Sequence, residues 1–195
     1  MPKVFFTADT HFGHANVIGF DDRPFKSVEE MDRELIRRWN NKVGTDDFVY
    51  VLGDMIWKTY NNAAPELIKK LNGKIVLIKG NHDRFLHNSK AKNALFGVKD
   101  YDDICVTLSD GYVRRVSLSH YYMPFYVGNR YRTIHLHGHS HNSEECFQEE
   151  FIKRFLAFNG FETQAYNVGC MHWDYEPVTL DEILARPKLV MRYEE

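Results

Sequence analysis

Between residues 4 and 78 the chain alternates short apolar runs with amphipathic stretches. The runs at 4–8, 48–52 and 74–78 are rich in valine, isoleucine and phenylalanine, which predicts buried β-strands. Helices are expected between them: one opens at Ser27, which has capping-box spacing with Glu30, and another covers residues 65–71. Strands that alternate with helices form parallel sheets, because each helix returns the chain to the same edge. The alternation therefore predicts an α/β fold.

The pattern changes after residue 100. Two apolar runs, at 104–108 and 112–119, flank Ser109-Asp110-Gly111, which predicts a β-hairpin. Further strands are expected at 132–137, 164–169 and 189–192, and helices at 143–158 and 179–184. We interpret the apolar stripes of two helices as core packing. These stripes are Met31, Leu35, Ile36 and Trp39 in the first helix and Phe147, Phe151, Phe155 and Phe158 in the helix at 143–158.

The composition is that of an ordinary globular protein. With 195 residues, 44% of them hydrophobic and 27% charged, the chain fits one domain. No apolar run approaches the roughly 18 residues of a membrane span, and the amino terminus lacks a signal-peptide layout, so we expect a cytoplasmic location. The spacing of Cys105, Cys146 and Cys170 fits neither a disulfide framework nor a zinc knot, and we interpret them as small core residues.

Polar side chains follow most of the expected strands, at the point where each strand ends. In α/β sheets the carboxyl ends of the strands meet at one edge, where ligands bind. Carboxylate, amide and imidazole groups in this mixture suit divalent transition metals, and one carboxylate can bridge two ions about 3.5–4 Å apart. A dinuclear metal site is therefore expected. Its candidate ligands are Asp9, His11, Asp54, Asn81, His120, His139 and His141.

Four of the ten histidines fall within residues 135–141. We expect Gly138 to turn the chain, so that His139 and His141 aim at neighbouring points. His135 and His137 alternate with apolar residues in the preceding strand, so they are expected to lie on its other face, behind the site.

Five blocks of the sequence resemble, in the same order, the motifs of the calcineurin-like metallophosphoesterases. They are Asp9-Thr10-His11, Gly53-Asp54, Gly80-Asn81-His82-Asp83, His120 and Gly138-His139-Ser140-His141. Residues 9–16 and 167–169 further resemble small bacterial and phage phosphoesterases of that family. The resemblance implies a four-layer α/β-β/α sandwich with two mixed β-sheets, and a metal site at the carboxyl ends of the strands. It also implies a single metallophosphoesterase domain over residues 1–195.

The resemblance also implies a role for each position. Asp9, His11, Asp54 and His141 would hold one metal ion, and Asp54, Asn81, His120 and His139 the other. Asp54 is then the bridging ligand. Asn81 and His82 are the implied catalytic residues, with His82 placed to steady or protonate the leaving oxygen. Manganese is the first expectation for the two ions, and iron, zinc, nickel and cobalt also suit these ligands.

One position departs from the family pattern. Many of its protein phosphatases carry a second acid three residues after the bridging aspartate, whereas Trp57 stands there in this chain. We therefore expect either that another carboxylate orients His82 or that His82 acts as a weaker acid. We interpret Trp57 as a packing residue, with a wall for a planar substrate group as the alternative. His14 and Arg84 are candidates for contact with substrate phosphate, while His87 and His172 are expected at the surface.

The implied function is hydrolysis of a small phosphomonoester or phosphodiester by attack of a metal-bridging hydroxide. A nuclease or cyclic-nucleotide phosphodiesterase of the same fold is one alternative. A nucleic-acid partner is disfavoured, because the formal net charge of −2 gives no basic excess. A non-catalytic binding or scaffold protein is the other alternative, and it is disfavoured because all seven ligand positions are filled. No membrane partner is expected, and the sequence leaves the oligomeric state open.

Overall fold

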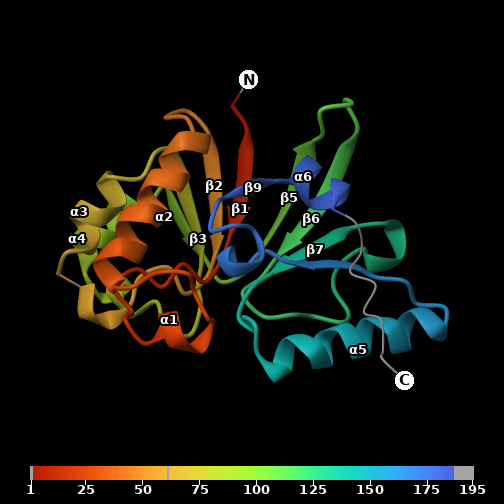
Figure 1. Cartoon of the computed structure of the whole chain (residues 1–195). Helices are drawn as coiled ribbons and strands as arrows, with labels where there is room; N and C mark the ends of the chain where they lie inside the picture. Colours follow the sequence, from red (N-terminus) through yellow and green to blue (C-terminus); the bar gives the residue numbers. More distant parts are fainter. Residues whose placement is uncertain (1, 61, 187–195) are drawn as a thin grey trace.

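Two mixed β-sheets lie face to face in the computed structural model, which describes residues 2–60 and 62–186 (Figure 1). The first sheet has the order β4-β3-β2-β1-β9. Its strands β1 (Val4–Thr7), β2 (Phe48–Leu52), β3 (Lys74–Ile78) and β4 (Gly97–Lys99) are parallel, and β9 (Val178–Thr179) pairs antiparallel with β1. The parallel strands therefore deliver their carboxyl ends to one edge.

The second sheet has the order β5-β6-β7-β8. Strands β5 (Asp102–Thr107) and β6 (Val113–Leu118) form the expected hairpin, closed by a hydrogen bond from the Gly111 N–H to the Leu108 carbonyl. Strands β7 (Ile134–His137) and β8 (Gln164–Asn167) continue the sheet in parallel with β6. The strands β6 and β7 thus end on the same side as β1 and β2, beside the first sheet.

Two apolar clusters make the core, one on each face of the first sheet. In β1, Phe5 enters the cluster beneath the helices, whereas its neighbour Phe6 enters the cluster between the sheets, as the alternation of a strand requires. The helices over the first sheet are α2 (Val28–Lys42), α3 (Ala64–Lys69) and α4 (Ser89–Ala94). Helix α5 (Glu144–Phe158) lies against the second sheet (Figure 1). The expected four-layer arrangement with two mixed sheets is confirmed.

The remaining elements are short. Helix α1 (Val17–Phe20) follows β1, and α6 (Leu180–Ala185) follows β9. Single turns of 3₁₀ helix cover η1 (Lys58–Tyr60), η2 (Arg84–His87), η3 (Asn129–Tyr131) and η4 (Cys170–His172). No helix in the described part of the chain is long and apolar enough to cross a membrane.

Helix α2 forms as its sequence predicts. The Ser27 hydroxyl accepts the Glu30 N–H at 3.2 Å. The Glu30 carboxylate accepts the N–H of Lys26 at 2.7 Å, and not the N–H of Ser27 that a capping box would use. Met31, Leu35 and Trp39 are buried in the core, so the interpretation of this stripe as packing is confirmed.

The corresponding prediction for α5 is wrong. Phe147, Phe151, Phe155 and Phe158 are 53%, 63%, 59% and 90% exposed, whereas Glu149 is buried. The cause is the outer face of β7, which carries His135 and His137, both fully buried. The side of α5 that turns inward carries the buried Glu149 and Leu156, with Glu149 3.8 Å from Nδ1 of His137, and the phenylalanines stay outside.

Three smaller points remain, of which the cysteine interpretation is a correction. The short strands β4 and β9 were not predicted, because runs of two or three residues carry no usable periodicity. The expected strand at 189–192 lies outside the described residues. Of the three free cysteines, only Cys170 is a core residue, since Cys105 is exposed and Cys146 is partly buried.

Candidate metal centre

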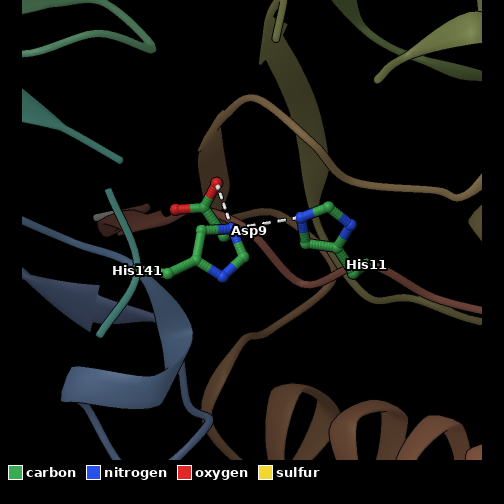
Figure 2. A group of neighbouring side chains, drawn as sticks. All are labelled: Asp9, His11 and His141. Atoms are coloured by element: carbon green, nitrogen blue, oxygen red, sulfur yellow. Dashed lines mark hydrogen bonds and ion pairs between the residues drawn. The ribbon is translucent and has the colours of Figure 1, made fainter. Parts of the chain in front are cut away.

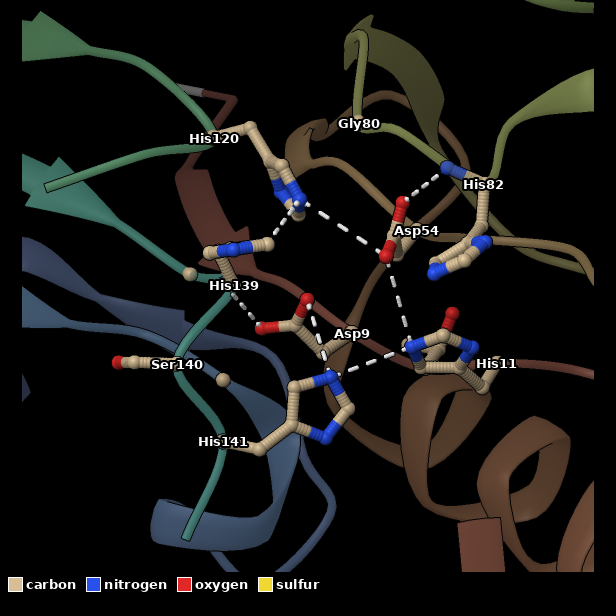
Figure 3. Close-up of polar contacts among 12 residues, drawn as sticks. Asp9, His11, Asp54, Gly80, His82, His120, His139, Ser140 and His141 are labelled. Carbon is tan, nitrogen blue, oxygen red and sulfur yellow. Dashed lines mark hydrogen bonds and ion pairs between the residues drawn. The ribbon is translucent and has the colours of Figure 1, made fainter. Parts of the chain in front are cut away.

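The carboxyl ends of β1, β2, β3, β6 and β7 bring the candidate ligands together at one edge of the sandwich (Figure 3). Ligand atoms of Asp9, His11 and His141 all lie within 4.8 Å of one another (Figure 2), and so do those of Asp9, Asp54 and His120. Residues up to 132 positions apart in the chain, from Asp9 to His141, thus form two adjoining groups that share Asp9.

Asp54, a member of the second group, also lies next to His11 of the first group. Its Oδ2 atom is 3.6 Å from Nε2 of His11 and 3.7 Å from Nε2 of His120. An oxygen in this position could contact a cation on either side, as a bridging ligand would.

The first group is closed by His141. Its Nε2 atom lies 3.2 Å from Nε2 of His11 and 3.6 Å from Oδ1 of Asp9. In the second group, Nε2 of His120 lies 2.9 Å from Oδ1 of Asn81 and 3.2 Å from Nδ1 of His139. The structure thus brings all seven predicted positions together, five in the two groups, and Asn81 and His139 through their contacts with His120.

Five of the seven candidates have left-handed backbone conformations. Their φ angles are 56° at Asp9, 49° at His11, 53° at Asp54, 74° at His139 and 47° at His141. Each such residue costs about 1–2 kcal/mol relative to an ordinary conformation. Strained residues that cluster where side chains converge are typical of functional sites.

Gly138 does not make the expected turn, because the left-handed residues are His139 and His141. Its requirement for glycine is one of space. A Cβ atom at this position would lie 2.5 Å from both the Cβ of Ala8 and Oδ2 of Asp9, closer than real contacts allow. Gly138 therefore lets the loop approach β1, and the two histidines turn the chain.

The buried polar atoms fit a divalent cation. Burial raises the pKa of Asp9 to about 7, and its Oδ1 atom has no hydrogen-bond partner within the described residues. Burial and the neighbouring His141 hold the pKa of His11 well below its usual range, which keeps its imidazole neutral. A cation between these groups would give Asp9 Oδ1 a partner and would use the neutral ring as a donor.

Asp21 and Arg23 form a support for this group that the sequence reasoning missed. Nδ1 of His141 lies 2.9 Å from Oδ1 of Asp21, and Arg23 contacts the same carboxylate at 2.8 Å. The buried Arg23 also donates to the backbone carbonyls of Asp9 and Thr10. Burial alone would lower the pKa of His141, but the hydrogen bond to Asp21 raises this pKa above its ordinary value. This arrangement fixes the ring so that Nε2 faces the site.

His139 has a corresponding acid on α5. Its Nε2 atom lies 3.6 Å from the Glu145 carboxylate, which leaves Nδ1 facing His120. The next residue, Ser140, donates its hydroxyl to the buried Glu149 at 3.0 Å and accepts the side-chain amide of Asn167 at 3.0 Å. The loop of His139 and His141 is therefore held from behind by α5 and β8.

Asp83 has a structural task that the sequence did not reveal. Its carboxylate accepts the backbone N–H groups of Asp54, Met55 and Gly80 at 3.0, 2.8 and 2.7 Å, and burial raises its pKa to about 6. It therefore braces the turn that carries Asp54. Among the described residues no ion pair joins the His82 ring to a carboxylate.

The aromatic groups beside the site are packed together. The ring of Trp57 stacks on His14 with 3.7 Å between centroids, and its distance from the His82 ring is 4.8 Å. This contact agrees with the interpretation of Trp57 as packing. Burial, with Arg23 nearby, lowers the pKa of His14 to about 4. Arg84, the other candidate substrate contact, is exposed.

Four further histidines outside the ligand set lie behind the site or near the surface. As expected, His135 and His137 lie on the face of β7 away from the site, where their rings stack 5.4 Å apart. His87 is exposed as expected. The surface prediction for His172 is wrong, because this residue is partly buried and its Nε2 lies 3.1 Å from the carbonyl oxygen of His141.

Comparison with known proteins agrees with this geometry. Residues 2–166 match the family described as Calcineurin-like phosphoesterase. The chain belongs to this family. Membership in it, together with the Asp–His groups, supports metal-dependent phosphoester hydrolysis as the class of activity.

Similar proteins span nearly the whole chain. An uncharacterized protein of Methanocaldococcus jannaschii is 37% identical over 94% of this chain and 90% of its own length. The gene 66 protein of Mycobacterium phage D29 is 33% identical over 94% of each chain. A crystal structure of a protein of unknown function from Aquifex aeolicus has a TM-score of 0.65 at 20% identity, covering 94% of this chain and 98% of that one. This last likeness shows the fold alone.

Proposed function

We propose that the protein is a dinuclear metal-dependent phosphoesterase that hydrolyses a small phosphomonoester or phosphodiester. The main support for two metal ions is the position of Asp54 Oδ2, which lies 3.6 Å from His11 Nε2 and 3.7 Å from His120 Nε2. A single metal ion would not need donors on both sides of one carboxylate oxygen.

Each ion would have four side chains. Asp9, His11, Asp54 and His141 would hold one, and Asp54, Asn81, His120 and His139 the other. Mixed oxygen and nitrogen donors suit manganese, and they also suit iron, cobalt, nickel and zinc. When bound, two such ions supply an activated water and neutralise the charge that develops on the phosphoryl oxygens.

His82 would hold the proton that the leaving oxygen takes. Its ring centroid lies 5.9 Å from that of His11 and the residue is partly exposed, so it borders the site on the solvent side. Its backbone N–H donates to Asp54 Oδ1 at 2.8 Å, which fixes the start of its side chain relative to the bridge. The exposed Asn81 stands beside it, where its amide can orient substrate as well as bind an ion.

The candidate substrate contacts differ in access. Arg84 is exposed directly after the His82 block, where a guanidinium can hold a phosphate by paired hydrogen bonds. His14 is buried to 8% exposure under the Trp57 ring, so its role would be to support this side of the site. A small phosphoester is proposed in preference to nucleic acid because the net charge is −2.

The test is hydrolysis of p-nitrophenyl phosphate and bis-p-nitrophenyl phosphate by protein stripped of metal and then supplied with Mn²⁺. We expect hydrolysis of at least one of them, only with metal present. Asp54→Asn should lose this activity, whereas Asp100→Asn, with a side chain that is 83% exposed, should keep it. Failure to hydrolyse either ester, in protein shown to bind two ions, would overturn the enzymatic proposal and favour a binding protein.

A substrate panel then separates the finer alternatives. Phosphomonoesters, linear phosphodiesters and cyclic nucleotides would be compared with Mn²⁺, Ni²⁺ and Zn²⁺. Binding to DNA or RNA with a steep dependence on salt concentration would favour a nuclease.

A further inference from the structure

The outer side of α5 carries a continuous row of phenylalanine rings. Phe147, Phe151, Phe155 and Phe158 follow one another at intervals of four, four and three residues, which places them on one side of a helix. Their exposed fractions are 53%, 63%, 59% and 90%, and Phe161 just beyond the helix is 38% exposed. We name these five residues the phenylalanine row.

The opposite side of α5 is already occupied. Glu149 is buried against Ser140, and the Lys153 ammonium lies 5.6 Å from the centre of the Tyr122 ring. The helix therefore cannot rotate to bury the phenylalanine row without breaking these contacts and exposing the buried histidines of β7. The exposure of the row is therefore a consequence of how α5 packs.

The area of the phenylalanine row is close to what a stable interface needs. A phenylalanine side chain offers about 150–250 Å², so the exposed fractions amount to about 600 Å² of apolar surface. The largest apolar patch of an ordinary monomer is about 300–600 Å², and each partner of a standard interface contributes about 800 Å². Polar residues that flank the row would supply the remainder.

We propose that the phenylalanine row is the interface between two copies of this chain, with α5 packed antiparallel to its counterpart across a two-fold axis. In such a dimer the same surface covers itself, so one row of rings spaced by three or four residues meets an identical row. Glu144 opens the acidic first turn of α5, and Arg154 lies ten residues further along the helix. Antiparallel packing therefore brings the acidic first turn of each helix toward the basic half of the other.

The charges of α5 favour a second copy over a membrane. Helices that lie on a membrane surface carry lysine and arginine on their polar side, whereas α5 has four glutamates against one lysine and one arginine. The phenylalanine row also lies on the side of α5 away from Glu149 and the loop of Ser140, so pairing leaves the metal centre uncovered.

The test is the mass of the protein in solution, measured by sedimentation over a range of concentrations. We expect the wild-type protein to have twice the mass of the 23.0 kDa chain. Phe151→Glu should weaken the dimer on the order of 100-fold, because the change occurs on both sides of the axis. Phe96→Glu is the matched control, since Phe96 is also 63% exposed but lies outside the row, and it should stay dimeric.

A second variant, Phe158→Glu, guards against misfolding as the cause, because its ring is 90% exposed. It should likewise give single chains, with an unchanged melting temperature when compared at concentrations where the wild type is also monomeric. A wild-type protein that is monomeric at every concentration would overturn the proposal, and so would a Phe151→Glu variant that remains dimeric. Monomeric wild-type protein that sediments with anionic vesicles, and loses this in Phe151→Glu, would assign the row to membranes instead.

Discussion

Nδ1 of His141 lies 2.9 Å from Oδ1 of Asp21, a residue 120 positions earlier in the chain. Arg23 holds the other oxygen of this carboxylate at 2.8 Å and also donates to the backbone carbonyls of Asp9 and Thr10. Through these contacts the loop after β1 and the loop after β7 are fixed relative to each other. The geometry of the first group of candidate ligands therefore depends on two residues outside the proposed ligand set.

Asp21→Asn should weaken metal binding by about 10- to 100-fold, because the carboxylate that fixes the His141 ring and raises its basicity is lost. Titration calorimetry of metal-free protein with Mn²⁺ measures this directly. The control is Asp22→Asn, since Asp22 is exposed in the same loop. Equal Mn²⁺ affinity in Asp21→Asn and wild type would show that Asp21 does not act on His141.

Asp83→Asn should lower the free energy of unfolding by about 2–3 kcal/mol. An amide at this position would face three backbone N–H donors with only one acceptor oxygen, and buried donors would be left unsatisfied. Urea unfolding of metal-free protein gives the value. Asp46→Asn, with a side chain that is 87% exposed, should leave the midpoint unchanged. The bracing role is refuted if the two variants unfold at the same urea concentration.

His82→Ala should reduce kcat by about 100-fold for an ester whose leaving oxygen needs a proton. The reduction should be smaller for p-nitrophenyl esters, since nitrophenolate leaves without protonation. Steady-state kinetics with an alkyl and a nitrophenyl ester measures the difference, and His87→Ala serves as an exposed control. Equal losses with both esters would argue against His82 as the proton donor.

The Glu149→Gln variant should become more stable relative to wild type as the pH rises. Burial raises the pKa of Glu149 from 4.5 to about 7, so the folded protein retains a proton that the unfolded chain has released. The contribution of Glu149 to stability therefore decreases as the pH rises from about 4.5 to about 7. A glutamine at this position is neutral throughout and can still accept the Ser140 hydroxyl. From about pH 5 to pH 8, the free energy of unfolding of the variant should rise relative to that of wild type by on the order of 2 kcal/mol. Parallel stability curves for metal-free wild type and variant would contradict this.

The sequence was sufficient for the parts of the fold and the site that local patterns encode. The apolar runs around Phe5, Val49 and Leu77 predict three buried strands, and the acid or histidine after each strand predicts where the candidate ligands gather. The order of the five motif blocks then led to the family. These features were predictable because strand burial and motif spacing are properties of neighbouring residues.

What the sequence could not reveal depends on contacts between distant segments. Asp21 and Arg23 stand in a loop with no periodicity, and only the approach of His141 gives them a role. The motif that contains Asp83 does not show that its carboxylate is directed at the backbone of the Asp54 turn. The sequence of α5 likewise does not show that the helix meets a sheet face carrying buried histidines, so its stripe alone predicts packing incorrectly.

The most direct test of the central claim is the number of ions bound per chain as activity returns. Metal-free protein would be titrated with Mn²⁺, with bound metal measured by elemental analysis and phosphoester hydrolysis measured on the same samples. We expect no activity without metal and full activity when two ions are bound per chain, in keeping with the donor nitrogens of His11 and His120 on either side of Asp54 Oδ2. Fewer than two ions at full activity, or activity that survives exhaustive chelation, would contradict the account.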